Sequence, residues 1–309
     1  MSDILVLDKE ATLAALDPRQ LMTAVAEALV AVARGHASAP PRTAAFAPGG
    51  LLGAMPGYVP GLGLAAKLVS VFHDPDRPGR SSHRGIVALF DPEDGRPLAV
   101  LDAEPITAWR TAASATHSAL ALAGPGPVVV VGTGVQARAQ VSLLAVLQPD
   151  VPVTVVGRDP AAARAVAALH PAGRAGDGIE DAVREAATVY CCTGATEPVL
   201  RREWLAPAAH VSSVGGSHGH ELDAETVREA ELFAEWPGAA GTAPPSGAHE
   251  LQGLPDDCGV TLLGSVLAGE APGRSSPGSL TVFKSTGHAA LDVAAAYVVH
   301  RSVSGGALR

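Results

Sequence analysis

The sequence predicts an α/β protein in which a doubly wound parallel sheet is joined to a second region with an antiparallel sheet. From Pro127 onward, short apolar runs alternate with helical stretches, a rhythm typical of parallel strand–helix–strand units. Between Pro40 and Asp102, short β-rich runs alternate with Gly, Pro and Asp, as in the turn at 91–95. This texture indicates an antiparallel meander.

The individual elements follow in order along the chain. Asp17-Pro18 opens a helix that ends at Gly35, because Asp caps a helix, Pro fits its first position and Gly closes it. After the meander, Glu104 to Ala123 is expected to be helical. The remaining strands are expected near 128–131, 153–157, 188–192, 210–214, 231–235 and within 279–287, and the remaining helices near 136–148, 160–169, 179–187, 223–230 and 289–299. The Gly/Pro/Ser-rich segments 237–248 and 269–279 are expected to be surface loops.

Length, charge and composition exclude several classes of protein. The 309 residues suffice for one or two domains, and the formal net charge of −9 argues against a nucleic-acid surface. The start MSDILVLDKEA carries acids where a signal peptide needs basic residues, and no apolar run is long enough to cross a bilayer. Three cysteines, Cys191, Cys192 and Cys258, give neither a disulfide framework nor a zinc spacing. We therefore expect a soluble cytoplasmic protein without nucleic-acid or membrane partners.

The stretch VVVVGTGVQARAQ, residues 128–140, has the context of a phosphate-binding turn. An apolar strand ends at Val131, Gly132 and Gly134 follow, and Ala137 takes the third small position. The first glycine permits a tight turn, the second lets the backbone approach a pyrophosphate, and the small residue lets the helix pack on the strand. The helix N-terminus then points at the phosphates. We predict a dinucleotide site here; the alternative is a purely structural turn.

The end of the following strand favours NADPH over NADH. The sequence VTVVGRDP places Gly157 and Arg158 at the strand tip, with Asp159 displaced outward. Sites selective for the unphosphorylated ribose usually carry a carboxylate there, which would repel a 2′-phosphate, whereas an Arg pairs with that phosphate through two hydrogen bonds. The alternative is that Arg158 is a solvated loop charge and that Asp159 reaches the ribose.

Three cations outside this region are candidates for holding an anionic substrate. Arg42 precedes the strand that ends at Met55-Pro56, Lys67 begins the run KLVSVF, and Arg110 lies in WRTAAS. Each of these charges, taken singly, is more often a solvated surface charge.

Together with several motifs, these cations form a recognisable set. The motifs are Met55-Pro56, Lys67, the Gly85 strand leading to the Asp91–Gly95 turn, Thr107-x-x-Arg110-Thr111-Ala112-Ala113, GTGVQA, Val214-Gly215-Gly216 and Phe283-Lys284-Ser285-x-Gly287. The set resembles the ornithine cyclodeaminase/mu-crystallin family, from about residue 40 to 299. Its motifs are most similar to those of the ketimine branch, the pyrroline-2-carboxylate and piperideine-2-carboxylate reductases.

The resemblance implies an architecture and a substrate site. A Rossmann NAD(P)-binding domain, 116–285, would be inserted into a second α+β domain, 1–115 plus 286–309, which carries the substrate and the interface of a homodimer. Arg42, Lys67 and Arg110 would hold the substrate carboxylate, with Met55 at the same site. This agrees with the physical expectation that a buried carboxylate needs several cations to offset its desolvation.

The resemblance also implies a set of cofactor contacts. Ser285 and Thr286 would lie near the nicotinamide, and the loop after Cys191 would touch the ribose through its backbone, leaving the thiols as bystanders. The complete expected set is Thr111, Gly132, Thr133, Gly134, Val135, Gln136, Gly157, Arg158, Cys192, Thr193, Gly194, Val214, Gly215, Ser285 and Thr286.

Two departures from the family pattern bear on the reaction. Cyclodeaminases carry an Asp after the VGG element, where this chain has Ser217, and a Glu before the Met-Pro pair, where it has a residue near Gly53. Cyclising a diamino acid requires carboxylates to orient the distal ammonium and to accept protons. Ser217 instead resembles the ketimine reductase branch. The expected catalytic residues are Lys67 and His218 as proton donors, with Ser217 relaying or orienting, and no metal site is expected at His218–His220.

These observations favour an NAD(P)H-dependent oxidoreductase that acts on CH–NH or C=N bonds. Its substrate would be a small cyclic imino acid with C=N next to a carboxylate, reduced to a proline- or pipecolate-type amino acid. One alternative is an amino-acid dehydrogenase, cyclodeaminase or biosynthetic synthase of the same family. The other is an NADPH-dependent ligand-binding protein, which the three carboxylate-binding cations disfavour.

Overall fold

The computed structural model describes residues 4–72, 83–215, 219–255 and 259–305, and it divides into two compact units. Unit 1 comprises residues 1–110 and 288–309, and unit 2 comprises residues 111–287. The chain passes from the first to the second within one helix, α3 (Ala103–Leu122), and returns between Gly287 and His288. No helix in the described part of the chain is both long enough and apolar enough to cross a membrane.

Unit 1 is built on a six-stranded sheet with the order β1-β6-β5-β4-β3-β2. The strands are β1 (Leu5–Leu7), β2 (Thr43–Ala47), β3 (Gly50–Val59), β4 (Gly63–Phe72), β5 (His83–Phe90) and β6 (Pro97–Asp102). Consecutive strands from β2 to β6 pair antiparallel, which confirms the meander expected between Pro40 and Asp102. The short β1 was not predicted, and it joins β6 in parallel.

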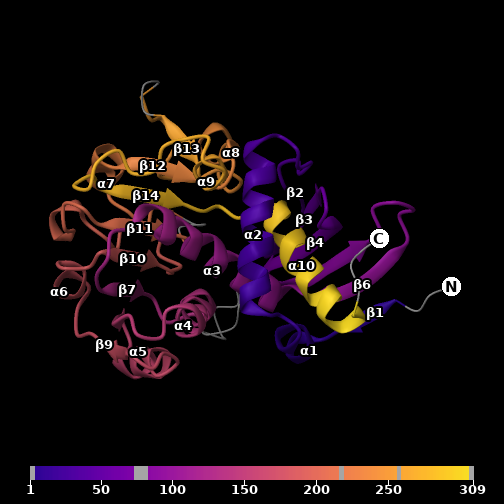
Figure 1. Cartoon of the computed structure of the whole chain (residues 1–309), viewed down its shortest axis with the longest axis horizontal. Coiled ribbons are helices and arrows are strands. Elements are labelled where there is room, and N and C mark those ends of the chain that lie inside the picture. Colours follow the sequence, from indigo (N-terminus) through magenta and orange to yellow (C-terminus); the bar gives the residue numbers. More distant parts are fainter. Residues whose placement is uncertain (1–3, 73–82, 216–218, 256–258, 306–309) are drawn as a thin grey trace. The chain divides into compact units, whose positions relative to one another are not determined.

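Helices cover one face of this sheet. They are α1 (Lys9–Ala14), α2 (Pro18–Ala33) and α10 (Ala289–Ser304). Although α2 and α10 are far apart in sequence, the two helices pack together. The predicted start of α2 is confirmed, since the Asp17 carboxylate accepts a hydrogen bond from the Gln20 amide at 2.7 Å. α10 packs on β3, β4 and β5 (Figure 1). The alternate residues of those strands, such as Met55, Val87 and Leu89, are buried beneath it.

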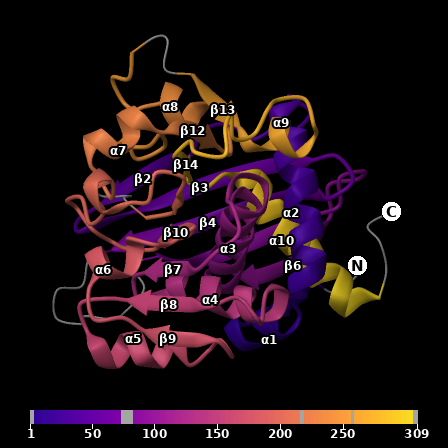
Figure 2. The ribbon, with the colours of Figure 1, turned by 60° about the vertical axis from the view of Figure 1, so that its left-hand side comes forward.

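Unit 2 is a doubly wound parallel sheet, as the sequence predicts, with the order β13-β12-β14-β11-β10-β7-β8-β9. Its strands are β7 (Val128–Val131), β8 (Val153–Val156), β9 (Gly173–Ala175), β10 (Thr188–Cys191), β11 (His210–Ser213), β12 (Glu231–Ala234), β13 (Val260–Leu262) and β14 (Thr281–Lys284). Figure 2 shows β10, β7 and β8 lying next to one another. The last strand in sequence, β14, pairs with both β11 and β12 in the interior of the sheet.

Helices pack on both faces of this sheet. They are α4 (Val135–Leu147), α5 (Pro160–Ala167), α6 (Ile179–Val183), α7 (Ala224–Glu229), α8 (Gly238–Gly241) and α9 (Leu263–Leu267), with a short 3₁₀ helix, η1 (Arg202–Trp204). In β7, Val128 and Val130 join the core with α4 and α5, whereas Val129 and Val131 join the core on the opposite face. Burial on both faces explains why this strand is a continuous run of valines rather than an alternating pattern.

The sequence-based expectations were incomplete in the shortest elements. Neither β9 nor β13 was predicted, nor were α1, α8 and α9, because each has only three to six residues. The expected surface loop 237–248 is wrong in part, because Ala239 and Ala248 are buried in the core of unit 2. The other predicted helices and strands are present, most of them within a few residues of the expected bounds.

Candidate active site

The glycine-rich turn of unit 2 connects β7 to α4. Gly132 has φ +123°, and a Cβ at this position would lie 2.4 Å from the Cys192 carbonyl oxygen, so only glycine fits. Gly134 is the N-cap of α4, where no side chain caps the helix, and a Cβ there would meet no atom within 4 Å. Ala137 is fully buried. The open N-terminus of α4 therefore fits a pyrophosphate, which would be bound by backbone amides and the helix dipole.

The tip of β8 carries the residues expected to distinguish the two nicotinamide cofactors. Gly157 lies beside the turn, since a Cβ here would be 2.6 Å from the Thr133 methyl carbon. The Asp159 carboxylate caps α5, accepting hydrogen bonds from the Ala161 amide at 2.8 Å and the Ala162 amide at 3.3 Å. Arg158 is exposed. The carboxylate of this tip is thus engaged in capping, and the guanidinium is the charged group left at the strand end.

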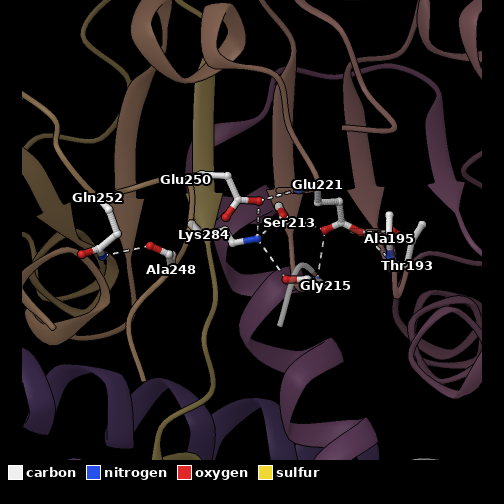
Figure 3. Close-up of polar contacts among 9 residues, drawn as sticks. All are labelled: Thr193, Ala195, Ser213, Gly215, Glu221, Ala248, Glu250, Gln252 and Lys284. Carbon is white, nitrogen blue, oxygen red and sulfur yellow. Dashed lines mark hydrogen bonds and ion pairs between the residues drawn. The ribbon is translucent and has the colours of Figure 1, made fainter. Parts of the chain in front are cut away.

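Glu221, which the sequence analysis did not single out, joins the loops that follow β10 and β11. Its Oε1 accepts hydrogen bonds from the amide and hydroxyl of Thr193 at 2.8 and 2.6 Å. Its Oε2 accepts from the Ser213 hydroxyl at 2.7 Å and the Gly215 amide at 3.1 Å (Figure 3). One fully buried carboxylate therefore fixes two loops that carry expected cofactor contacts, the loop at 192–194 and the loop at 214–215.

A buried lysine supports the same loops from β14. The Lys284 ammonium donates to the Ser213 hydroxyl at 2.8 Å, the Gly215 carbonyl at 2.9 Å and Glu250 Oε1 at 3.0 Å. Figure 3 shows this ammonium between Gly215 and Glu250. Glu250 Oε1 also accepts from the Glu221 amide at 2.7 Å. The lysine of the FKSxG motif is therefore a structural cation that joins the ends of β14 and β11 to Glu250.

A third buried carboxylate, Glu235, holds the loop after β14. Its Oε1 accepts hydrogen bonds from the Ser285 hydroxyl at 3.2 Å and from the amides of Thr286 and Gly287 at 2.7 and 2.6 Å. The Thr286 hydroxyl accepts from the Trp236 indole N–H at 2.9 Å. The structure thus places Ser285 and Thr286 in a fixed loop at the carboxyl end of a central strand, the edge where parallel sheets bind ligands.

Two of the three expected substrate-binding cations meet in unit 1. Lys67 on β4 and Arg110 on α3 are only 3% and 4% exposed, and both contact Asp292 of α10. The Lys67 ammonium lies 3.0 Å from Asp292 Oδ1 and 2.9 Å from Oδ2, and Arg110 Nε donates to Oδ1 at 2.9 Å. The Thr107 hydroxyl accepts from the Lys67 ammonium at 3.4 Å. Asp292 is not among the residues predicted from sequence, because its only local signal is a single acid within an apolar stretch of helix.

Burial and neighbouring charges change the proton affinities in this cluster. The pKa of Lys67 is lowered to about 8, chiefly by burial, with Arg110 and Arg42 lowering it as well and Asp292 opposing them. Burial alone would raise the pKa of the Asp292 carboxyl, but the Lys67 and Arg110 charges hold it below its usual value. Burial lowers the pKa of His288 to about 4. Arg42 thus acts on the cluster through its charge.

The remaining expected residues are placed as follows. Met55 is buried and is the partner of Lys67 in the β3–β4 register. Thr111 is a buried residue of α3, and Val135 and Gln136 lie in the first turn of α4. Ser217 and His218 lie outside the described residues. Among the residues that the structure describes, no three His, Cys, Asp or Glu side chains are arranged to hold a metal ion.

Comparison with known proteins identifies the family. The sequence model of the ornithine cyclodeaminase/mu-crystallin family matches residues 4–307. The chain belongs to this family. Ketimine reductase mu-crystallin of Mus musculus is 35% identical over 263 residues, which cover 83% of this chain and 82% of the relative. Delta(1)-pyrroline-2-carboxylate reductase 2 of Burkholderia ambifaria is 32% identical over 310 residues, 96% and 94% of the two chains.

Solved structures of similar fold cover 98% of the chain. Delta(1)-pyrroline-2-carboxylate reductase of Thermococcus litoralis, in complex with NADH and L-proline, has a TM-score of 0.82, 25% identity and 98% coverage of its own chain. The iminosuccinate reductase of Paracoccus denitrificans with NAD⁺ has a TM-score of 0.85, 25% identity and 97% coverage. An archaeal alanine dehydrogenase dimer with bound NAD has a TM-score of 0.83, 28% identity and 96% coverage. The expected family, fold class and nicotinamide-dependent oxidoreductase activity are confirmed at this level.

Proposed function

We propose that the protein is an NAD(P)H-dependent reductase of a small cyclic imino acid, and that it forms a proline- or pipecolate-type amino acid. The observation that carries this proposal is the buried contact of Lys67 and Arg110 with one carboxylate, Asp292. The charge of Arg42 acts on the same cluster, so three cations are offset by only a single carboxylate. The excess positive charge favours an anionic ligand. The imino acid in the names of the relatives, pyrroline-2-carboxylate, carries a carboxylate that supplies this negative charge.

The proposal assigns a role to each unit. Unit 1 would bind the substrate carboxylate through Arg42, Lys67 and Arg110, with the apolar Met55 beside them. Unit 2 would hold the dinucleotide at the open N-terminus of α4, and the loops fixed by Glu221 and Glu235 would contact its nicotinamide half. The nicotinamide supplies hydride to the imine carbon when it is bound.

Lys67 is proposed as the proton donor. An imine accepts hydride most readily when its nitrogen is protonated, so an acid whose pKa lies near the pH of the medium is needed. With the pKa of Lys67 lowered to about 8 by burial, the ammonium is protonated at neutral pH and releases its proton more easily than an exposed lysine does. Ser217 and His218 remain proposed as relaying or alternative groups.

Cyclodeamination is disfavoured by the residue types at two positions. Where cyclodeaminases of the family carry carboxylates, this chain has Ser217 and a residue near Gly53, which is a buried β3 residue paired with Val69. Asp292, the carboxylate of the Lys67–Arg110 cluster, is already shared between two cations. Without a carboxylate to orient a distal ammonium, imine reduction is the better supported reaction.

The test is to measure the loss of NADPH absorbance with each member of a panel of substrates. We expect oxidation of NADPH with pyrroline-2-carboxylate or piperideine-2-carboxylate, and little turnover with ornithine or with pyruvate plus ammonia. Fast turnover with pyruvate and ammonia would instead assign an acyclic amino-acid dehydrogenase. Tight nucleotide binding without oxidation in the presence of any imino acid would refute the reductase proposal and favour a ligand-binding protein.

We further propose that NADPH is preferred over NADH. Arg158 is the exposed cation at the β8 tip, and the neighbouring Asp159 is committed to capping α5. Replacing Arg158 with Ala should raise the Michaelis constant for NADPH far more than that for NADH, because only NADPH carries the 2′-phosphate. Equal effects on the two cofactors would remove Arg158 from the phosphate site.

A homodimer is proposed from the face of the unit 1 sheet that lies opposite to α10. Ala54, Leu68 and Ile86 form one row across β3, β4 and β5, on the face opposite to the buried Met55 and Lys67. Further exposed apolar side chains of that face are Val6, Leu52, Tyr58 and Phe72. A contiguous apolar surface of this kind marks an interface, and a dimer is known for the archaeal relative. Light scattering should give a dimer, and Leu68→Asp with Ile86→Asp should give a monomer; a monomeric wild type would refute the proposal.

A further inference from the structure

Asp292 lies in an environment where a carboxylate is costly. It is 1% exposed on α10, between the buried residues Leu291 and Val293. Removing a carboxylate from water costs several kcal/mol unless partners compensate. Both of its oxygens lie within 3.0 Å of the Lys67 ammonium, and Oδ1 also accepts from Arg110 Nε. The carboxylate is therefore stable at this place only in the presence of the two cations.

The two cations depend equally on Asp292. Lys67 and Arg110 reach the cluster from different elements, β4 and α3. Two buried positive charges that contact the same carboxylate oxygen are close enough to repel one another. Long side chains also lose conformational freedom when they are fixed. A single carboxylate that contacts both offsets the repulsion and gives each cation one orientation.

We propose that Asp292 is a positioning residue, which holds the Lys67 ammonium and the Arg110 guanidinium side by side and keeps the ammonium charged, so that a substrate carboxylate meets two cations. The inference rests on the proposed function, because it assumes an anionic substrate at this cluster. It adds a residue that acts through others rather than by contact with the substrate.

The charged groups around Lys67 determine what removal of Asp292 should do. Asp292 from α10 raises the pKa of Lys67, whereas burial, Arg110 from α3 and Arg42 from the segment before β2 lower it. The strand neighbours in register, Met55 and Val87, are apolar. His288 is neutral at neutral pH, since burial lowers its pKa to about 4. Without Asp292, burial and the two arginines still lower the pKa of Lys67, and the neutral Thr107 hydroxyl that accepts from its ammonium opposes them less than a carboxylate does. Lys67 should therefore lose its proton at a lower pH.

The lysine content of the chain allows a direct measurement. Lys9, Lys67 and Lys284 are its only lysines, so protein labelled with ¹³C at lysine Cε gives three signals that can be followed against pH. Lys9 is exposed and is assigned with Lys9→Arg, and Lys67 with Lys67→Arg. In the wild type the Lys67 signal should titrate with a midpoint near pH 8, in line with the lowered pKa of its ammonium. In Asp292→Asn the midpoint should fall by about one pH unit or more.

The matched control is Asp91→Asn. Asp91 is also a buried aspartate of unit 1, but it is paired with Arg96 at 2.6 Å in the turn between β5 and β6. This variant removes the charge of a buried aspartate and its pair with the half-exposed Arg96 without touching the cluster, so its Lys67 midpoint should equal that of the wild type. An unchanged midpoint in Asp292→Asn would overturn the inference.

Ligand binding tests the consequence for substrate. With NADP⁺ present, the dissociation constant of L-proline at pH 8 should rise about tenfold or more in Asp292→Asn, while that of NADPH stays within twofold. Unchanged proline affinity would overturn the positioning role. If Asp292→Asn does not fold, Asp292→Glu replaces it: Lys67 should stay protonated while proline binds more weakly, and unchanged proline affinity in this variant would again overturn the role. If the wild type neither binds proline nor reduces an imino acid, the proposed function fails, and the lysine titration still decides whether Asp292 keeps Lys67 charged.

Discussion

Two glycines of one turn should respond differently to the same substitution. Gly132 and Gly134 are two residues apart, and Gly→Ala adds one methyl group to each. At Gly132 the methyl carbon would lie 2.4 Å from the Cys192 carbonyl oxygen, on a backbone with φ +123°. At Gly134 the backbone has φ −79°, and the methyl group would meet no atom within 4 Å.

The magnitudes follow from this geometry. A non-glycine residue in the region of Gly132 costs roughly 1–3 kcal/mol in backbone strain, and the overlap with a backbone oxygen adds to that cost. We therefore expect Gly132→Ala to lose about 3 kcal/mol of unfolding free energy or more, which lowers the Tm by roughly 6–12 °C. For Gly134→Ala, the gain from a less flexible unfolded chain and the loss of a glycine N-cap are each about 1 kcal/mol or less and offset one another.

The assay combines thermal unfolding with a nucleotide titration followed by NADPH fluorescence. Gly134→Ala should melt like the wild type yet bind NADPH about tenfold more weakly or worse, because the methyl group occupies the space where backbone approaches the pyrophosphate. Gly132→Ala should lose both stability and affinity. Unchanged NADPH affinity in Gly134→Ala would refute the assignment of this turn to the pyrophosphate, and a wild-type Tm in Gly132→Ala would refute the packing argument.

Three further predictions concern buried groups of unit 2. Glu221→Gln replaces one acceptor oxygen with a donor, so it should weaken NADPH binding and cost about 1–3 kcal/mol of unfolding free energy. The control Glu229→Gln, at an exposed position, should do neither, and equal behaviour of the two variants in titration and melting would contradict this prediction. His210 is fully buried between two hydroxyls, and burial lowers its pKa to about 3. The contribution of the neutral imidazole to stability is therefore complete above about pH 6.5 and is lost as the pH falls toward 3, at up to about 1.4 kcal/mol per pH unit. Urea unfolding between pH 7 and 4 should therefore show a steeper loss for the wild type than for His210→Asn, and parallel curves would count against it. Burial raises the pKa of both Cys191 and Cys192, so in a Cys258→Ser background a thiol reagent should react only after denaturation, and a fast reaction of the folded protein would disprove this.

The parallel sheet could be read from sequence because its strands are buried on both faces. A strand such as β7 then consists entirely of apolar residues, and its ends coincide with the ends of the apolar run. The three-residue strands β9 and β13 have no such run, since Gly173–Ala175 is only half buried and Val260–Leu262 likewise. Their pairing depends on the neighbouring strand, which local sequence does not reveal.

The candidate site was predictable where a motif fixes a backbone conformation or names a cation. Gly132 is of the first kind and Lys67 of the second. The carboxylates that position these groups were not found, because their partners are distant in sequence: Asp292 and Lys67 are 225 residues apart. A buried acid such as Glu221 differs in no local feature from a solvated one. Its role appears only when the loops it joins are brought together by the fold.

The position of β14 makes the order of synthesis matter for this chain. β14 lies between β11 and β12, so neither of these strands has its full set of partners until residues 281–284 have left the ribosome. α10, which follows directly, supplies the helix that covers β3, β4 and β5 in unit 1. Both units therefore complete their cores with one stretch, residues 281–304, and until it is synthesised each exposes apolar surface or strand edges. A long interval of this kind is where nascent chains need protection from aggregation.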